Sequence, residues 1–122
     1  MKKLAVAGLA LAASFSVLTV SPAQASLADR NLITLWQHDD YQGTRKDYTC
    51  VTLGHENLGT LENQASSMAN ASYVGVDLYS GDNFTGVRYY AAPRSNDSDF
   101  TNNGFDNTVE SLRFRKIPCD VP

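Results

Sequence analysis

Two stretches of the sequence carry side chains that could act as an acid and a base. His38 is followed by Asp39 and Asp40, and His55 is followed by Glu56, so each histidine has a carboxylate that could orient it. Hydrolysis would also need an activated nucleophile, and no G-x-S-x-G motif accompanies either histidine. Neighbouring residues of an extended chain point to opposite faces, so these pairs would not converge. We therefore expect loop histidines and a protein that is not an enzyme.

The first 25 residues have the three parts of a secretory signal peptide. Lys2 and Lys3 give a basic start, residues 4–20 are mostly apolar and uncharged, and Ala23-Gln24-Ala25 is a small-residue cleavage site. An uncleaved membrane anchor is the alternative, although it would need about 20 apolar residues and a stop-transfer flank. We expect cleavage after Ala25, secretion, and one small domain formed by residues 26–122.

The two cysteines, Cys50 and Cys119, both lie in the exported part of the chain. An even number of cysteines in an oxidising compartment predicts a disulfide. It would close a loop of about 70 residues, which is worth roughly 4 kcal/mol. A zinc site that combines the cysteines and the two histidines is the alternative, but the C-x-x-C and H-x-x-x-H spacings of such sites are absent. We predict a Cys50–Cys119 disulfide.

The charge balance restricts the partners of the protein. The chain has 13 acidic and 10 basic side chains, for a net charge of -3, and it contains no run of lysine or arginine. Nucleic acids and anionic membranes bind clusters of basic residues. We therefore expect neither as a partner, and we expect a monomer whose acidic balance suits a solvated surface or a cation site.

An aromatic–x₄–aromatic–x–glycine pattern occurs twice in the chain, 43 positions apart. Its members are Trp36, Tyr41 and Gly43 in the first copy and Tyr79, Phe84 and Gly86 in the second. A second matching pair, residues 62–68 and 106–112, repeats after 44 positions. Such a period indicates two copies of one supersecondary unit. We assign motif 1 to about residues 32–73 and motif 2 to about residues 74–117.

The repeated units consist of strands and turns. Residues 32–36 and 74–79 alternate apolar and polar side chains and are rich in β-branched and aromatic types, as strands are. Sustained helical periodicity is missing, and the loops are rich in Gly, Asn, Asp and Ser. We predict an all-β fold of about eight short strands in a two-sheet sandwich. The paired aromatics could instead form a carbohydrate platform, but their repetition with variable polar residues between them favours a folding role.

This doubled pattern, followed about 20 residues later by an acidic or amide pair and a serine, resembles the βγ-crystallin Greek-key motif. The resemblance covers residues 32–116 and implies a Greek-key sandwich with four strands per motif. It also implies that Ser67 and Ser111 hydrogen-bond back onto the folded hairpins, which is a structural role.

Many microbial domains that this sequence resembles bind calcium through paired blocks of the form N/D-N/D-x-x-S/T-S. The first block departs from this form at Glu62, and the second departs at Glu110. The resemblance implies two sites shared crosswise between the motifs. One would use the Ser66 hydroxyl, the Gln64 carbonyl and the Asn107 side chain, and the other would use Glu110, the Thr108 carbonyl and Asn63.

Calcium takes six to eight hard oxygen ligands, and a site with few full charges binds it weakly. For the first site we expect a dissociation constant on the order of 10⁻⁴–10⁻³ M. We expect no obligatory cofactor, and calcium is the one candidate. The alternative is a pair of hydrogen-bonded Ser/Asn loops without a metal.

The chain also resembles secreted actinobacterial metalloproteinase inhibitors built on the same fold. The match rests on the exported context, the repeated hairpins and the run that ends in Thr49-Cys50-Val51. The resemblance implies that the segment Cys50, Val51, Thr52 and Leu53 enters the cleft of a secreted zinc endopeptidase, although the inhibitors carry two disulfides and this chain can form one. Inhibition is the leading hypothesis. Calcium binding and a killer-toxin-like antimicrobial role are the alternatives, and a purely structural disulfide also remains open.

Overall fold

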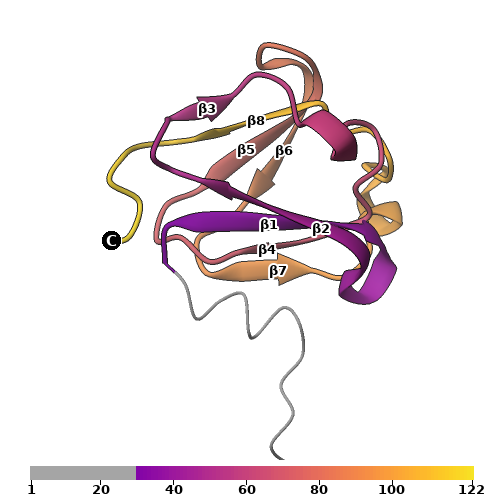
Figure 1. Cartoon of the computed structure of the whole chain (residues 1–122), viewed down its shortest axis with the longest axis horizontal. Helices are drawn as coiled ribbons and strands as arrows, with labels where there is room; N and C mark the ends of the chain where they lie inside the picture. The colour runs from indigo at the N-terminus through magenta and orange to yellow at the C-terminus, as the bar shows by residue number, and fades with distance from the viewer. Residues whose placement is uncertain (1–29) are drawn as a thin grey trace, which may run out of the picture.

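A computed structural model describes residues 30–122, and the predicted signal peptide lies outside these residues. The described chain forms eight β-strands and three short 3₁₀ helices (Figure 1). The strands are β1 (Leu32–His38), β2 (Gln42–Thr49), β3 (Gly54–His55), β4 (Ser67–Asn70), β5 (Val76–Gly81), β6 (Thr85–Ala91), β7 (Ser95–Asp97) and β8 (Ser111–Phe114). The helices are η1 (Asp39–Tyr41), η2 (Gly59–Leu61) and η3 (Phe100–Asn103). The all-β prediction is confirmed.

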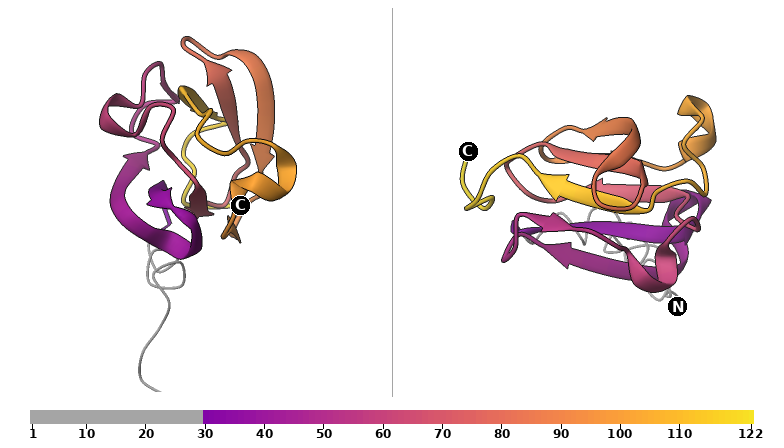
Figure 2. Two further views of the ribbon diagram at one scale, coloured as in Figure 1. Left: turned by 90° about the vertical axis from the view of Figure 1, so that its right-hand side faces the viewer. Right: turned by 90° about the horizontal axis from the view of Figure 1, so that it is seen from above.

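The strands form two antiparallel four-stranded sheets, in the orders β2-β1-β4-β7 and β3-β8-β5-β6. Figure 2 shows the two sheets as separate layers that face each other. Strand β3 comes from motif 1 but lies in the sheet of motif 2, and β7 makes the reverse exchange. The predicted two-sheet Greek-key sandwich is therefore present, with one strand of each motif placed in the other motif's sheet.

The core lies between the inner faces of the sheets, where every second residue of a strand points inward. Ile33 and Leu35 of β1, Val76 and Leu78 of β5, and Phe114 of β8 are fully buried. Leu53, after β2, is half-buried and packs against this core. Within residues 30–122, no helix has the length and apolar character that crossing a bilayer requires.

Both glycine-containing hairpins fold back over their own strands in the same way. The Trp36 and Tyr41 rings meet edge to face with centroids 5.2 Å apart. In motif 2 the corresponding rings, of Tyr79 and Phe84, lie 6.0 Å apart. Gly43 has a φ of 82°, and a Cβ atom there would lie 2.6 Å from the His38 ring. Only glycine fits this left-handed, crowded position without strain.

A buried serine forms two hydrogen bonds to each folded hairpin. The Ser67 hydroxyl donates to the His38 carbonyl (2.7 Å) and accepts from the Tyr41 N–H (3.2 Å). The Ser111 hydroxyl donates to the Gly81 carbonyl (2.6 Å) and accepts from the N–H of Phe84 (3.0 Å). Tyr41 and Phe84 share an unusual φ of 61°, so each serine holds a hairpin in a conformation that the chain alone disfavours.

Candidate functional site

The two Asn/Ser blocks come together at one end of the sandwich. The Asn63 N–H donates to the Val109 carbonyl (2.8 Å), and the Asn107 N–H donates to the Ala65 carbonyl (3.0 Å). Asn63 and Asn107 also share a left-handed backbone, with φ values of 59° and 57°. These reciprocal bonds connect the blocks crosswise, so each motif can contribute side chains to a site that belongs to the other.

The first cradle is a cavity of about 730 Å³ beside the hairpin of motif 1. Its lining is polar and consists of Gln37, His38, Asp39, Gln42, Asn63, Gln64, Ser66, Asp106 and Asn107. The structure therefore brings together Ser66, Gln64 and Asn107, the three residues of the first predicted site. The Ser66 hydroxyl lies 3.5 Å from the Asn107 side-chain oxygen.

The Asp106 carboxylate in the first cradle has one oxygen without a hydrogen-bond partner within residues 30–122. Asp106 Oδ1 is buried and has no hydrogen-bond partner among the described residues, whereas Oδ2 accepts from the Asn107 side chain at 3.2 Å. Burial raises the pKa of Asp39 in the same cavity, and the negative charges of Asp99, Asp106 and Asp40 add to this effect. A buried acceptor without a partner is costly, and a bound cation or an ordered water would remove that cost.

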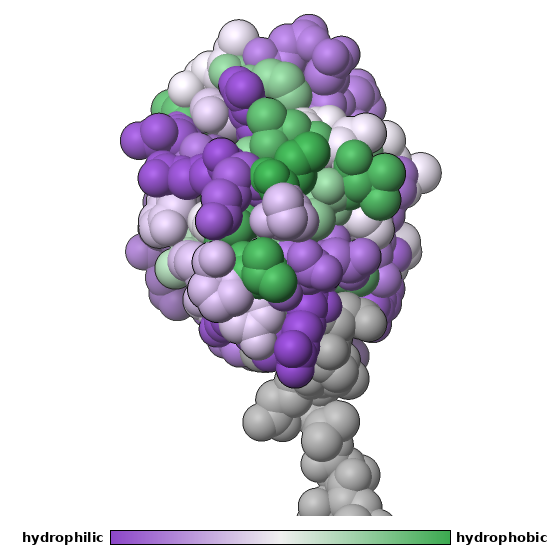
Figure 3. All heavy atoms as spheres, turned by 90° about the vertical axis from the view of Figure 1, so that its left-hand side faces the viewer, coloured by the Kyte–Doolittle hydropathy of each residue, from purple (hydrophilic) through white to green (hydrophobic). Residues whose placement is uncertain are grey.

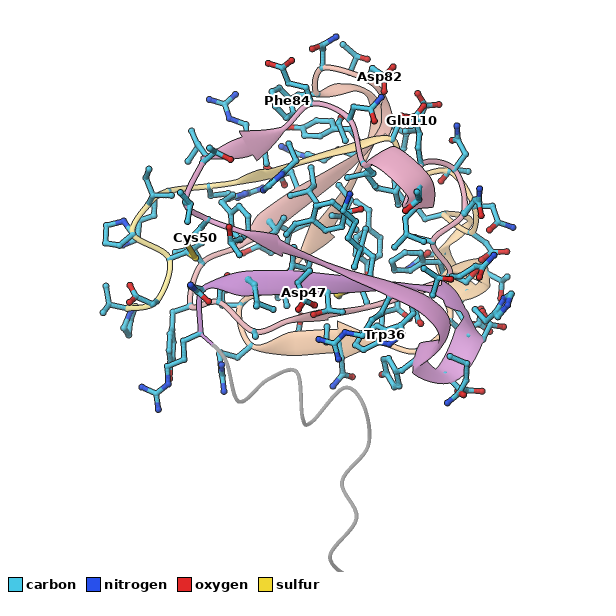
Figure 4. The ribbon with its side chains drawn as sticks, in the orientation of Figure 1. Trp36, Asp47, Cys50, Asp82, Phe84 and Glu110 are labelled. Carbon is cyan, nitrogen blue, oxygen red and sulfur yellow. A yellow bond between two sulfur atoms is a disulfide. The ribbon has the colours of Figure 1, made fainter. Side chains whose placement is uncertain are left out.

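The second cradle is a cluster of three acidic side chains beside the hairpin of motif 2. One carboxylate oxygen from each of Glu62, Asp82 and Glu110 lies within 4.8 Å of the others. Figure 4 shows Asp82 and Glu110 close together, far from Cys50 at the opposite end of the molecule. Burial raises the pKa of Glu62, and the charges of Asp82 and Glu110 raise it further. These side chains therefore repel one another when no cation lies between them.

The two cradles are built to one plan. Each takes an acid from its own hairpin, and Asp82 follows Asp39 by 43 positions. Each takes a residue from its own block, and Glu110 follows Ser66 by 44 positions. Each also takes an acid from the block of the other motif, which is Asp106 in the first cradle. Glu62, 44 positions earlier, has this role in the second.

The second cradle differs from the set predicted with Glu110. The structure places Asn63 along the first cavity, and the side chain that it brings to Glu110 is that of Glu62. Thr108 uses its hydroxyl to bond the Phe105 carbonyl (2.8 Å). Asp39, Asp82 and Asp106 were not among the calcium ligands predicted from the sequence. The 43- and 44-residue offsets of the repeat relate each of these acids to its counterpart, and that relation is the signal that could have identified them.

The predicted inhibitory segment lies at the other end of the sandwich. The Cys50–Cys119 disulfide is present and joins residues 69 positions apart. The Cys50 N–H donates to the Asn31 carbonyl (2.9 Å), and the Leu53 carbonyl accepts from the Phe114 N–H (2.7 Å). Between these anchors Val51 is 80% exposed, the highest value among the large apolar side chains of residues 30–122.

Further apolar side chains lie near this segment in the C-terminal stretch. Ile117 and Val121 flank Cys119 and are each 49% exposed. Figure 3 looks onto the end of the molecule that contains Cys50 and shows hydrophobic atoms at its surface among polar ones. The disulfide therefore connects the segment that carries Val51 to the C-terminal stretch that carries Ile117 and Val121.

Comparison with solved structures identifies the fold. The chain superposes on a structure that concerns the evolution of the eye lens βγ-crystallin domain fold, with a TM-score of 0.66 and 16% identity over 82% of this chain and 94% of that one. It is also similar to the N-terminal domain of protein S, with a TM-score of 0.60 and 25% identity over 71% of this chain and 98% of that chain.

A βγ-crystallin domain from Flavobacterium johnsoniae gives a TM-score of 0.56 and 25% identity over 70% of this chain and 96% of that chain. No protein-family model matches the sequence, and no curated protein does. The protein thus has the βγ-crystallin fold, which explains why both hairpins and both cradles repeat.

Proposed function

We propose that this protein is a calcium-binding module with two cation sites at the loop end of its sandwich. The observation that carries this proposal is the buried Oδ1 atom of Asp106, which has no partner among residues 30–122 and belongs to a cavity lined by oxygen-bearing side chains. The second cradle supports the same function, because its three carboxylates gather within 4.8 Å of one another.

The donor types in both cradles suit calcium. Calcium prefers carboxylate, amide, hydroxyl and backbone carbonyl oxygens and accepts irregular geometry. In the first cradle Asp39, Ser66 and Asp106 would hold the ion, and in the second Glu62, Asp82 and Glu110 would. Each bound ion would neutralise the carboxylates of its cradle and connect one hairpin to the block of the other motif. Disulfides persist in oxidising compartments, and extracellular calcium modules work at dissociation constants of about 10⁻⁴–10⁻³ M, so we also propose that the protein acts outside the cell. We further propose that it has no catalytic activity of its own.

A calcium titration by calorimetry, combined with thermal melting, tests this function. We expect two binding events in the wild-type protein, and a melting temperature that rises with calcium, because a ligand that binds only the folded state stabilises it. Asp106→Asn should weaken one of the two events by about tenfold or more, since it removes a charged ligand. Asp120→Asn removes an exposed acid outside both cradles and is the matched control. An unchanged melting temperature in millimolar calcium would contradict the proposal.

We propose inhibition of a secreted zinc endopeptidase as a second function, because one observation favours it. Val51 is 80% exposed on a segment that the disulfide and two backbone hydrogen bonds hold in place. A segment that is already ordered loses little conformational entropy when it binds, and this is how rigid inhibitors gain affinity. Thermolysin-type enzymes accept a bulky apolar residue after the scissile bond, and Val51 would occupy that position.

Titration against a thermolysin-like protease tests the second function. Val51→Asp should weaken inhibition by at least about tenfold, because a charge would have to enter an apolar pocket. Val87→Asp is the control, since Val87 is 66% exposed but lies on β6. If the wild-type protein does not inhibit at micromolar concentration, this function is excluded and the calcium function is unaffected.

A further inference from the structure

The outer faces of the two sheets carry different charges although they derive from the same motif. In motif 1, Arg45 lies opposite Trp36 in the β-ladder and makes two hydrogen bonds to Asp47, at 2.9 and 3.1 Å. In motif 2, Arg88 lies opposite Tyr79 in the same way. The residue that corresponds to Asp47, 43 positions later, is a tyrosine. Arg88 therefore lacks a carboxylate on its own strand, and its ion pair is with Asp77 of β5.

Strand β8 and the residue that follows it add two more arginines to the face of motif 2. Arg113 lies opposite Asp77 in the ladder, and Arg115 makes two hydrogen bonds to the Asp77 carboxylate, at 3.2 and 3.0 Å. The positions 44 residues earlier, in motif 1, are the alanines Ala69 and Ala71. The arginine cluster is thus specific to the sheet β3-β8-β5-β6.

Asp77 is the one carboxylate among these residues, and it pairs with Arg115 at 3.0 Å and with Arg88 at 3.8 Å. Asp77 is only 7% exposed, and its ion pair with Arg88 is the longer one, too long for a hydrogen bond. Arg113 forms no ion pair within the described part of the chain, and its guanidinium lies 5.6 Å from the centre of the Phe84 ring. Three positive charges against one negative charge leave an excess of two on this face.

The arginines surround a hollow rather than pointing away from each other. A cavity of about 470 Å³ lies on the sheet and is lined by Asp77, Tyr79, Arg88, Arg113, Phe114 and Arg115. The chain as a whole is acidic, with a net charge of -3, so this local excess of positive charge opposes the general balance. Guanidinium groups present forked N–H donors that match the oxygens of a phosphate or sulfate group.

We propose that this arginine pocket binds an oxyanion, namely a phosphate or sulfate group, through the Arg88 and Arg113 guanidinium groups. Arg115 adds a third positive charge, and Asp77 fixes its position through two hydrogen bonds. The pocket lies on the outer face of a sheet and shares no lining residue with either calcium cradle or with the Cys50 segment. The proposal therefore stands independently of the proposed functions.

Titration of the calcium-free protein with inorganic phosphate, followed by NMR of the arginine side-chain N–H groups, tests the site. We expect saturable shifts of the Arg88 and Arg113 signals, with a dissociation constant of about 1 mM. Arg88→Gln combined with Arg113→Gln should weaken binding by at least about tenfold, because both forked donors are lost. Arg45→Gln is the matched control, since Arg45 holds the same place in motif 1 but is neutralised by Asp47; we expect it to bind phosphate as the wild type does.

A second arm uses glucose 6-phosphate to distinguish a phosphate ester from the free ion. Binding of both probes shows that the pocket accepts a phosphate ester as well as the free ion, and binding of inorganic phosphate alone restricts it to the free ion; both outcomes support the oxyanion site. If the double variant does not fold, Arg113→Gln alone provides the same measurement, because that side chain is exposed and makes no ion pair in residues 30–122. Absence of saturable shifts, or equal weakening by Arg45→Gln, overturns the proposal.

Discussion

The two copies of the motif agree in how their hairpins fold and differ in the ligands that their cradles offer. Each hairpin pairs two aromatic rings, has a glycine with positive φ in its returning strand, and is held by hydrogen bonds to a buried serine. The first cradle offers Ser66 where the second offers Glu110. A few residues therefore maintain the backbone conformation of both hairpins, while the side chains that line the cradles differ and offer different ligands.

This difference has an electrostatic consequence. The first cradle contains two carboxylates, from Asp39 and Asp106, and the second contains three. More carboxylates raise calcium affinity, but they also repel one another when the site is empty. We expect the second cradle to bind calcium more tightly and to destabilise the calcium-free protein more strongly.

The largest expected effect on stability comes from removing the disulfide. The Cys50–Cys119 disulfide joins motif 1 to the segment after motif 2 and spans 69 positions. Replacing both cysteines by alanine should lower the free energy of unfolding by roughly 4 kcal/mol, because the unfolded chain regains the entropy of an open loop. Urea denaturation measures this value. A loss below about 1 kcal/mol would show that contacts between the copies hold them together without the disulfide.

Replacing the two buried serines tests whether both hairpins depend equally on their serine hydrogen bonds. Ser67→Ala and Ser111→Ala should each cost about 2 kcal/mol, because each change leaves a hairpin N–H and a carbonyl without their partner. Urea denaturation of both variants gives the comparison, and Ser95→Ala, on the edge strand β7, is the control. Clearly unequal losses would mean that one hairpin depends less on its serine than the geometry indicates.

Glu110→Ser gives the second cradle the ligand type of the first. The change should weaken calcium binding at the second cradle by about tenfold, since one of three carboxylates is lost. It should also raise the melting temperature of the calcium-free protein, because it removes repulsion from Glu62 and Asp82. Calorimetry and melting in the presence of a chelator measure the two effects. A lower melting temperature in chelator would contradict the repulsion.

The smallest effect is a pH dependence of the calcium-free protein. The pKa of Glu62 is raised above 4.5, so the folded state binds this proton more readily than the unfolded chain does. The contribution of Glu62 to stability should therefore rise as the pH falls through the raised pKa towards 4.5. Melting temperatures of the wild type and Glu62→Gln across this range isolate the contribution, because the glutamine cannot titrate. Parallel curves for the two proteins would exclude it.

The sequence predicts the fold well because the folding device is local and occurs twice. The spacing of Trp36, Tyr41 and Gly43 already specifies a hairpin that folds back on itself, and its repetition specifies the second. The places of β3 and β7 were not predicted, since strands of two and three residues are too short to carry a periodic pattern.

The cradles are predicted less completely because their members meet only through tertiary structure. Ser66 and Asn107 follow from the blocks, but the pairing of Glu110 with Glu62 depends on how the two motifs cross. The isolation of Asp106 Oδ1 depends on packing that no single stretch of sequence encodes. The arginine face is a similar case, because Arg88 and Arg113 belong to strands on either side of β5.

The exchange of β3 and β7 makes the two halves mutually dependent. A polypeptide that ended near residue 73 would carry β3 without the sheet it completes, and it would lack the strand that closes its own sheet at β4. This fragment and the remaining fragment, produced separately, should reassemble. The first supplies β3 to the sheet of the second, and the second supplies β7 to the sheet of the first. If each fragment is fused to one half of a split reporter protein, the reporter should therefore regain its signal only when both fragments are present in the same solution.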